Sequence, residues 1–346
     1  MLKVGILGCG KIAQVRHIPE YLDNKNVEIL GYYSRNIERA NTMAEMNGGI
    51  AYGSYEELLQ NPEIDAVSIC TANSVHAEMT IAALKAGKHV LFEKPMATSL
   101  EDCEEMVKVA KEMNKVLVVG HNQRFAEAHV KAKKLIRDGI IGDVISFRTI
   151  FGHKGPETWS INPGRDVWFF DKNQAAMGVL GDLGIHKTDL MHYLLDDVIV
   201  ETTAVLSTLN KRDSQDQLIT VDDEAMCIYK FKNGVTGTMT ASWNYYGPED
   251  NSTIIYGTKG VIRIYEGKEY SIKVNLENEE NIYYDISKIQ TNKSQTKSKV
   301  IDDFVESILD DKVSINSGQE ALKTMRVIFK SIESSNLGRK VLISQN

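Results

Sequence analysis

Residues 181–190 read GDLGIHKTDL, and in this stretch Asp182 and His186 stand four positions apart. Helix-forming neighbours continue to LMHYLL, so both side chains are expected on one face of a helix, one turn apart. An imidazole can take or give a proton near neutral pH, and a neighbouring carboxylate can hold its tautomer. The pair fits a structural hydrogen bond or a proton-transfer site, and the other motifs must decide between them.

A second candidate is Lys94 in the sequence Glu93-Lys94-Pro95, which ends the predicted apolar strand KHVLFEKP. In an open parallel sheet, ligands bind beyond the carboxyl ends of the strands. A lysine fixed there by a proline is expected to point toward the ligand, although a surface lysine has the same pattern. As a fixed cation, Lys94 would stabilise an alkoxide that develops during oxidation of an alcohol.

A third candidate is the sequence GCGKIA at residues 8–13, between the first predicted strand and the first predicted helix. It has the form G-x-G-x-x-A in the context that a dinucleotide-binding unit requires. Gly8 permits a tight turn, Gly10 lets the backbone approach a pyrophosphate, and Ala13 lets the helix pack closely on the strand. The alternative is a glycine turn that binds nothing. The three motifs together favour hydride and proton transfer over a purely structural Asp182–His186 pair.

The first third of the chain alternates strand and helix patterns. Strands are predicted at LKVGILG, VEILGYYS, DAVSICTA, KHVLFEKP and KVLVVGHN. The helical patterns between them favour right-handed crossovers and a parallel sheet.

The pattern changes near residue 123 to strands joined by tight turns such as FKNGV and YGTKGV. Two helices, near 298–311 and 317–334, close the chain. The predicted fold class is α/β: a Rossmann dinucleotide-binding domain over residues 1–122, then an α+β domain over residues 123–346. The second domain is expected to bind substrate and to contain a large, mostly antiparallel open sheet.

Bulk properties exclude several classes of protein. A chain of 346 residues favours two domains, and 42% apolar with 25% charged residues is typical of a globular protein. The net charge of −7 argues against nucleic-acid binding. No apolar run approaches the roughly 20 residues of a membrane span. The N-terminus reads as a strand and not as a signal peptide, so a cytoplasmic location is expected.

The cysteines give no sign of a metal site. They stand at positions 9, 70, 103 and 227, and none forms a C-x-x-C pair. A reduced state and no bound metal are therefore expected. Asp222 and Asp223, near the start of a strand, read as solvated charge.

Four stretches together resemble the Gfo/Idh/MocA oxidoreductases: GCGKIA, TANSVHAEM at residues 71–79, FEKPMA and GDLGIHKTDL. The resemblance covers essentially the whole chain. It implies that Lys94 lies near the nicotinamide and the reacting carbon, that His186 transfers the proton, and that Asp182 supports His186. It also implies a cis peptide bond between Lys94 and Pro95.

The resemblance extends to the cofactor and the substrate. The implied cofactor-binding residues are Gly8, Gly10, Lys11, Ile12, Ala13, Ser34, Arg35, Thr71, Asn73, His76, Glu93 and Lys94. Candidate substrate-binding residues are Arg124, His153 and Trp168. Relatives often have Trp-Arg where this chain has Trp168-Phe169, and three glycines where it has Ala176-Met177-Gly178, so no relative's substrate transfers directly. The aromatic residues, Trp243 among them, fit either a wall against a sugar ring or simple packing, and His17 is assigned no role.

These features predict an NAD(P)-dependent dehydrogenase or reductase that acts on a CH–OH group of a sugar, a cyclic polyol or a related carbohydrate. Two other classes fit the same fold. One is a glycosidase-type enzyme that oxidises its substrate transiently and eliminates the aglycone. The other is a non-catalytic dinucleotide-binding sugar sensor, against which the intact Lys94 and His186 argue. A homo-oligomer formed through the open sheet is expected, as in relatives.

The second predicted strand ends at Ser34-Arg35-Asn36, where NAD-selective units usually have an acidic residue for the adenosine ribose. The missing carboxylate leaves room for a 2′-phosphate, and Arg35 could pair with it. NADP is therefore favoured over NAD.

Overall fold

The computed structural model describes residues 1–287 and 297–344. The chain divides into two compact units. The first comprises Met1–Asn122 and the described part of Asn292–Leu322, and the second comprises the described parts of Gln123–Thr291 and Lys323–Asn346. Residues 297–322 fall in the first unit, not in the second as the sequence pattern suggests. Helix α9 (Val300–Leu309) contacts helix α1 (Ile18–Asp23), and the Asn24 amide donates to Asp302 over 2.9 Å.

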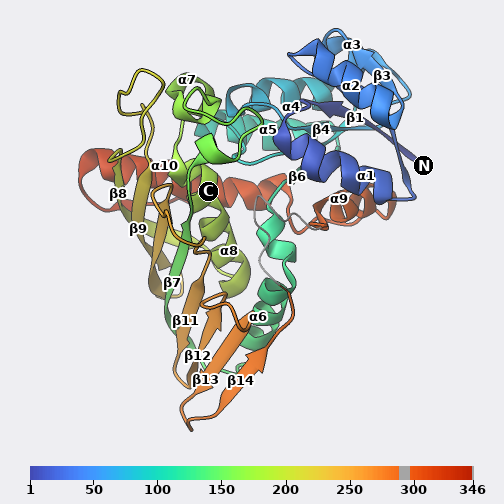
Figure 1. Ribbon diagram of the computed structural model, residues 1–346. Helices are drawn as coiled ribbons and strands as arrows, with labels where there is room; N and C mark the ends of the chain where they lie inside the picture. Colours follow the sequence, from blue (N-terminus) through green and yellow to red (C-terminus); the bar gives the residue numbers. More distant parts are fainter. Residues whose placement is uncertain (288–296, 345–346) are drawn as a thin grey trace. The chain divides into compact units, whose positions relative to one another are not determined.

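The first unit contains a six-stranded parallel sheet in the order β3-β2-β1-β4-β5-β6 (Figure 1). Its strands are β1 Leu2–Leu7, β2 Val27–Tyr33, β3 Ile50–Tyr52, β4 Ala66–Ile69, β5 His89–Phe92 and β6 Leu117–Val119. Five of these match the predicted strands, and β3 is an additional three-residue edge strand. All of β4 is buried, as expected for a strand with both faces of its sheet covered.

The helices between these strands begin and end where local signals predict. Ser54 caps helix α3 (Tyr55–Gln60) by accepting a hydrogen bond from the Glu57 amide over 3.2 Å. Gly87, with φ +79°, follows the end of helix α4 (His76–Lys85). A π-helical turn, Ala13–His17, precedes α1 directly after the glycine loop. The remaining helices that lie wholly in this unit are α2 Ile37–Asn47, α3 Tyr55–Gln60, α4 His76–Lys85 and α5 Leu100–Glu112.

The second unit contains a nine-stranded sheet in the order β14-β13-β12-β11-β7-β10-β9-β8-β15. Its pairs are antiparallel except for β10 with β7, which is parallel. The strands are β7 Val144–Gly152, β8 Ile199–Ser207, β9 Glu224–Phe231, β10 Thr236–Ser242, β11 Thr253–Gly257, β12 Gly260–Ile264, β13 Ile272–Leu276, β14 Asn281–Tyr284 and β15 Val341–Leu342. The predicted fold class is confirmed.

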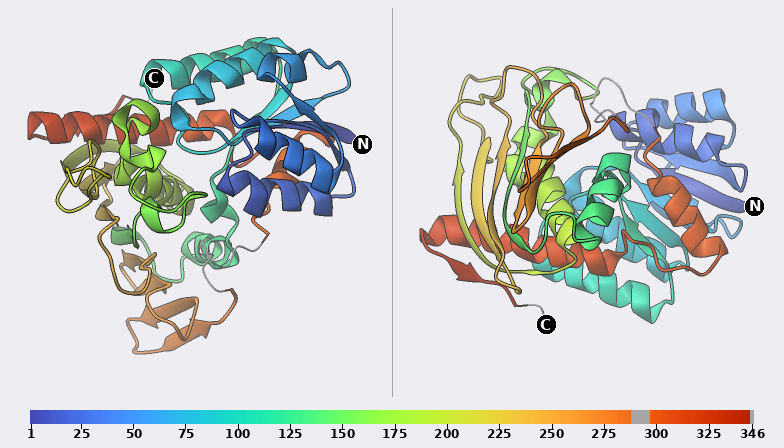
Figure 2. Two further views of the ribbon diagram at one scale, coloured as in Figure 1. Left: turned by 45° about the horizontal axis from the view of Figure 1, so that its top comes forward. Right: turned by 90° about the horizontal axis from the view of Figure 1, so that it is seen from below.

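Among the described residues, helices cover one face of this sheet and leave the other face bare. Helix α8 (Ile185–Leu195) and the π-helical turn before it, Leu180–Gly184, contact strands β7 and β10 (Figure 2). Residues of β9 alternate accordingly: Ala225, Cys227, Tyr229 and Phe231 are buried, and Met226, Ile228 and Lys230 are exposed. The other helices of the unit are α6 Glu127–Arg137 and α7 Lys172–Ala175, and α10 Gly318–Leu337 runs from the first unit into the second.

A search of the helices in the described part of the chain found none with the length and apolar character needed to cross a membrane.

Candidate active site

The glycine loop has the geometry of a phosphate cradle. Gly8 has φ +98°, and a Cβ at this position would lie 2.7 Å from the Cys70 carbonyl carbon, so only glycine fits. A Cβ at Gly10 would meet nothing closer than the Cys70 carbonyl oxygen at 3.8 Å. Ala13 is fully buried against the sheet. The loop is thus tight at Gly8 and open at Gly10, where a dinucleotide pyrophosphate would approach.

The segment after β4 forms the neighbouring wall of this cradle. The Thr71 hydroxyl oxygen is buried and has no hydrogen-bond partner among the described residues, and the Asn73 side chain is buried as well. An orphaned hydroxyl beside an open glycine loop fits a dinucleotide with its many acceptors. Lys11 and Ile12 extend from the loop into the first helix, with Lys11 exposed.

Arg39 is a cofactor candidate that the sequence did not single out. Ser34, directly after β2, is buried, and Arg35 is exposed. Arg39 lies in the first turn of α2, where its amide donates to the Asn36 side chain over 3.4 Å. Burial raises the pKa of Cys9 to about 12, and the charge of Arg39 opposes this rise. The sequence signal that could have identified Arg39 is a basic residue in the first turn of the helix that follows Ser34.

His76 ties the Thr71 segment to the turn that carries Lys94. Its Nδ1 lies 2.9 Å from the Pro95 carbonyl oxygen, and its Nε2 lies 3.2 Å from the Thr71 carbonyl oxygen. Burial lowers the pKa of His76. A neutral imidazole has a single N–H and can donate to only one of the two carbonyl groups. The shorter contact identifies the Pro95 carbonyl oxygen as the acceptor. His76 therefore holds the Thr71 segment and the Pro95 turn together.

Strand β5 ends at Phe92, so Glu93-Lys94-Pro95 forms a turn directly after the strand and not its last residues, and its Lys94–Pro95 peptide bond is cis. Lys94 is half-buried, whereas Glu93 is only 7% exposed. Burial alone would raise the pKa of Glu93, but a hydrogen bond from His17 and the charges of His17, Arg16 and Lys94 lower it to about 2. Glu93 is therefore an ionised carboxylate that lies under the lysine.

In the second unit, Asp182 and His186 lie at the start of α8, and both are buried, at 6% and 9% exposure. Asp182 belongs to the π-helical turn Leu180–Gly184, and His186 to the first turn of the α-helix. The Trp243 indole N–H donates to Asp182 Oδ2 over 3.1 Å. Single-turn π-helices frequently mark functional sites, because they redirect side chains that a regular helix would place elsewhere.

Aromatic rings continue from His186 through the same unit. The His186 ring lies 6.0 Å from Phe151, Phe151 lies 5.5 Å from His153, and His153 lies 6.4 Å from Trp159, all between ring centroids. Trp159 in turn meets Phe169 at 5.1 Å, and Phe169 stacks on Trp168 at 3.9 Å. Two of the three candidate substrate residues, His153 and Trp168, therefore belong to one aromatic series with His186.

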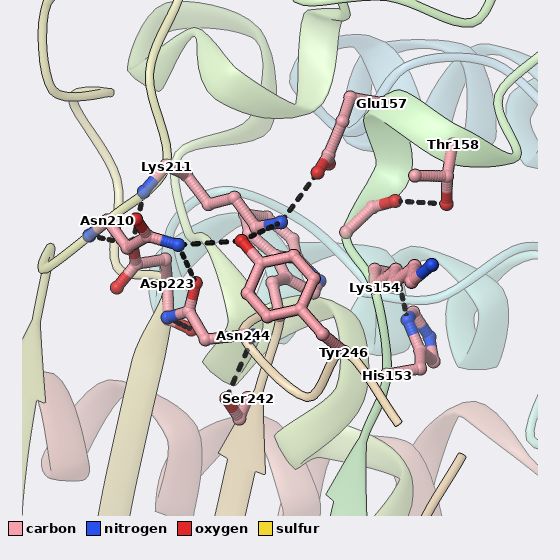
Figure 3. Close-up of polar contacts among 12 residues, drawn as sticks. His153, Lys154, Glu157, Thr158, Asn210, Lys211, Asp223, Ser242, Asn244 and Tyr246 are labelled. Atoms are coloured by element: carbon pink, nitrogen blue, oxygen red, sulfur yellow. Dashed lines mark hydrogen bonds and ion pairs between the residues drawn. The ribbon is translucent and has the colours of Figure 1, made fainter. Parts of the chain in front are cut away.

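A buried ion pair holds the segment that supplies Trp159. Lys211 Nζ lies 2.5 Å from Glu157 Oε1 and 3.4 Å from the Tyr246 hydroxyl (Figure 3). The Asn210 amide donates to the same hydroxyl over 2.6 Å. These contacts join the loop after β7 to the loop after β8, and they hold the segment that places Trp159 in the middle of the aromatic series.

Arg124, the third candidate, lies elsewhere in the second unit. Its guanidinium is 3% exposed and donates to both carboxylate oxygens of Asp189, over 2.8 and 2.7 Å. This bidentate pair occupies the Nε and Nη2 edge of the guanidinium, the edge that would bind a planar anionic group of a ligand. Arg124 is therefore a structural residue in our account and is left out of the proposed site.

Asp223 is fully buried and Asp222 is half-buried, and both accept backbone amides, so the prediction of solvated charge was wrong. Asp223 accepts hydrogen bonds from the backbone amides of Leu209, Asn210 and Lys211. Asp222 accepts from the amides of Gly178 and Leu180 over 2.9 and 2.7 Å and so caps the turn that carries Asp182. Two adjacent acidic residues before a strand gave no signal that both would bind amides.

The described residues contain no group of three or more His, Cys, Asp or Glu side chains that could hold a metal ion. All four cysteines are buried and free.

Comparison with known proteins identifies the family. Residues 2–121 match the Gfo/Idh/MocA oxidoreductase family with its NAD-binding Rossmann fold, and residues 129–263 match the C-terminal domain of the same family. Levoglucosan dehydrogenase from Pseudarthrobacter phenanthrenivorans is 36% identical over 227 residues, which are 60% of this chain and 57% of that protein. The chain thus aligns with less than two thirds of this relative.

Two further similarities cover more of the chain. 1,5-Anhydro-D-fructose reductase from Ensifer adhaerens is 33% identical over 68% of this chain and 67% of that protein. A solved structure of levoglucosan dehydrogenase in complex with NADH and levoglucosan superimposes with a TM-score of 0.86 at 26% identity, covering 100% of both chains. The resemblance read from the sequence is confirmed, and the chain belongs to the Gfo/Idh/MocA oxidoreductase family.

Proposed function

We propose that this protein transfers a hydride between a nicotinamide dinucleotide and a secondary alcohol or ketone of a sugar, cyclic polyol or related carbohydrate. One observation carries the proposal: a member of this oxidoreductase family retains both an open cradle at Gly10 and a buried Asp182 and His186 at the start of α8. A sensor without turnover would have no need of the buried acid and imidazole.

The bound nicotinamide supplies the hydride chemistry, and the chain supplies the rest. His186 takes the hydroxyl proton during oxidation and returns it during reduction. Asp182, oriented by Trp243, favours the charged form of the histidine. Lys94 stabilises the negative charge that develops on the substrate oxygen.

The relatives support the substrate class. Their names include levoglucosan dehydrogenase, 1,5-anhydro-D-fructose reductase and myo-inositol 2-dehydrogenase, which are proteins that act on rings with several hydroxyl groups. The series of rings from His186 to Trp168 offers apolar surface against which one face of a sugar ring can pack. His153 adds a polar group beside that surface.

NADP is the favoured cofactor. Ser34 and Arg35 follow β2 without a carboxylate to repel a 2′-phosphate, and Arg39 adds a second cation in the first turn of α2. Guanidinium groups suit phosphate because they donate in a planar fork.

The bare face of the nine-stranded sheet supports a homo-oligomer. Val205 is 63% exposed, and Met226 and Ile228 are each 55% exposed. Val205 and Met226 are paired neighbours on adjacent strands, so these side chains form a contiguous apolar patch. We propose that a second copy of the chain covers it.

A panel of sugars, anhydrosugars and inositols, each mixed with NAD⁺ or NADP⁺, tests the proposed function. Formation of reduced nicotinamide with at least one of them is the expected result. Chromogenic glycosides run in parallel test the glycosidase-type alternative, which releases aglycone without net reduction. Dinucleotide binding without either reaction would favour the sensor and contradict the proposal.

A further inference from the structure

A buried polar cluster joins three segments of the first unit. His17, in the π-helical turn after the glycine loop, places Nδ1 2.6 Å from the Ser68 hydroxyl of β4 and Nε2 2.9 Å from Glu93 Oε1. Arg16 Nη1 lies 3.8 Å from the same oxygen. His17 is 1% exposed, Ser68 is 0% exposed and Arg16 is 8% exposed, so the cluster is shielded from bulk solvent.

The protonation pattern of the cluster follows from its partners. Glu93 is ionised, and an ionised carboxylate can only accept hydrogen bonds. His17 therefore carries a proton on Nε2 and donates it to Glu93. Nδ1 faces a hydroxyl that can donate as well as accept, so the ring is satisfied on both sides.

Glu93 in turn fixes the turn that carries Lys94. Its second oxygen, Oε2, accepts from the Lys94 backbone amide over 3.3 Å. On the opposite side, a Cβ at Gly120 would lie 2.9 Å from Oε1, so the backbone there packs directly against the carboxylate. The Glu93 side chain is thus held between His17, Gly120 and the Lys94 amide.

We infer that His17 is a positioning residue for Lys94, acting through Glu93, and that it couples the glycine loop to the lysine turn. The inference rests on the proposed function, in which Lys94 stabilises the substrate oxygen. One imidazole connects the helix that begins at the phosphate cradle with the strand end that supplies the cation. A shift of the first helix on dinucleotide binding would then be transmitted to Lys94 through hydrogen bonds.

Two substitutions of His17 separate positioning from simple packing. His17→Gln places a side-chain amide N–H near the position of Nε2 and preserves the bond to Glu93, whereas His17→Ala removes it. His129→Ala is the matched control, because His129 is also fully buried and its Nδ1 lies 2.8 Å from the Gln123 carbonyl oxygen. Lys94→Ala gives the effect of losing the cation itself.

The first readout is steady-state kinetics together with dinucleotide affinity. His17→Ala is expected to lower kcat by about tenfold or more while the dinucleotide Kd changes by less than about threefold, because an interaction at the reacting oxygen acts mainly in the transition state. His17→Gln is expected to recover a large part of kcat. Equal losses in His17→Ala and His129→Ala, or no rescue by glutamine, would overturn the inference.

The second readout needs no substrate. Hydrogen exchange of the Lys94 backbone amide reports whether Glu93 still holds the turn. Exchange is expected to be about fivefold faster in His17→Ala than in the wild type, with His17→Gln close to the wild type. Unchanged exchange in a folded His17→Ala protein would contradict the inference. If no carbohydrate were oxidised by the wild type, the proposed function would fail while this comparison still decided the role of His17.

Gly120→Ala tests the same cluster from the other side and leaves His17 in place. Its methyl group would displace the Glu93 carboxylate, so the Lys94 amide should again exchange faster and kcat should again fall. If His17→Ala does not fold, Gly120→Ala still tests whether Glu93 positions Lys94. Wild-type exchange and wild-type kcat in Gly120→Ala would show that Glu93 does not position the lysine.

Discussion

Trp243 donates its indole N–H to Asp182 Oδ2 over 3.1 Å, and the tryptophan is completely buried. Trp243 is the first residue after β10, whereas Asp182 lies in the turn before α8. The end of a sheet strand therefore orients the carboxylate that supports the proposed proton-transfer histidine.

Trp243→Phe tests this contact, because it keeps most of the buried ring and removes the only N–H donor of the side chain. A hydrogen bond to a charged group contributes about 1.5–3 kcal/mol. We expect kcat/KM to fall about 10-fold or more, with the dinucleotide Kd unchanged. The matched control is Phe231→Leu, which changes a fully buried ring of β9 that lies outside the aromatic series. A loss smaller than about threefold in Trp243→Phe would remove the indole from the mechanism.

Lys187 gives the protein a defined pH dependence of stability. Burial lowers the pKa of Lys187 to about 7, an effect that the charges of Asp250 and Glu249 oppose, and its Nζ donates to the Asn251 carbonyl over 2.9 Å. The unfolded chain keeps this proton up to the ordinary lysine pKa of 10.5. Between those two values the unfolded state binds more protons, so this group makes the free energy of unfolding rise with pH.

Lys187→Met should therefore flatten the rise between about pH 7 and pH 9 by up to about 1.4 kcal/mol per pH unit. Urea unfolding at several pH values measures it, with the exposed Lys85→Met as control. Equal slopes in the wild type and Lys187→Met would show that the buried amine keeps its ordinary pKa.

Cofactor preference should depend on the residues after β2. Ser34→Asp adds a carboxylate where a 2′-phosphate would bind, and it should weaken NADPH binding about 10- to 150-fold, as expected for about 1.5–3 kcal/mol. Arg39→Ala should weaken NADPH binding more than NADH binding. Fluorescence titration of both reduced cofactors measures these effects. A wild type that prefers NADH would contradict the assignment.

The proposed oligomer should depend on the bare sheet face. Ile228→Glu places a charge in the centre of the patch formed by Val205, Met226 and Ile228, and burying it would cost several kcal/mol. We expect the variant to sediment as a monomer, or to dissociate at much higher concentration than the wild type. Gln60→Glu, on the exposed end of α3, adds the same charge away from the patch and should change nothing. A monomeric wild type would refute the proposed interface.

The sequence predicted most of the fold because the signals were local. Five of the six strands of the parallel sheet are apolar runs, three of them closed by glycine or proline, and Ser54 and Gly87 mark helix ends. The edge strand β3 has only three residues and was missed, since so short a run has no measurable alternation.

The sequence predicted candidate-site residues only where a reactive residue type stands at the spacing of a recognisable motif. Lys94, Asp182 and His186 lie in recognisable motifs, whereas the roles of His17 and Trp243 depend on contacts with Glu93 and Asp182 far along the chain. For Arg124 and Asp223, the residue type alone did not indicate the partners that the structure shows. Their charges suggested a ligand or solvent, but tertiary packing gave them Asp189 and three backbone amides as partners.

The central claim is that His186 handles the substrate proton. The most direct measurement is kcat/KM of His186→Ala with a carbohydrate that the wild type oxidises, together with the dinucleotide Kd of the same variant. Loss of a general base typically costs about 10²- to 10⁴-fold, so we predict a loss in that range with dinucleotide binding intact. A loss of less than about threefold would contradict the account.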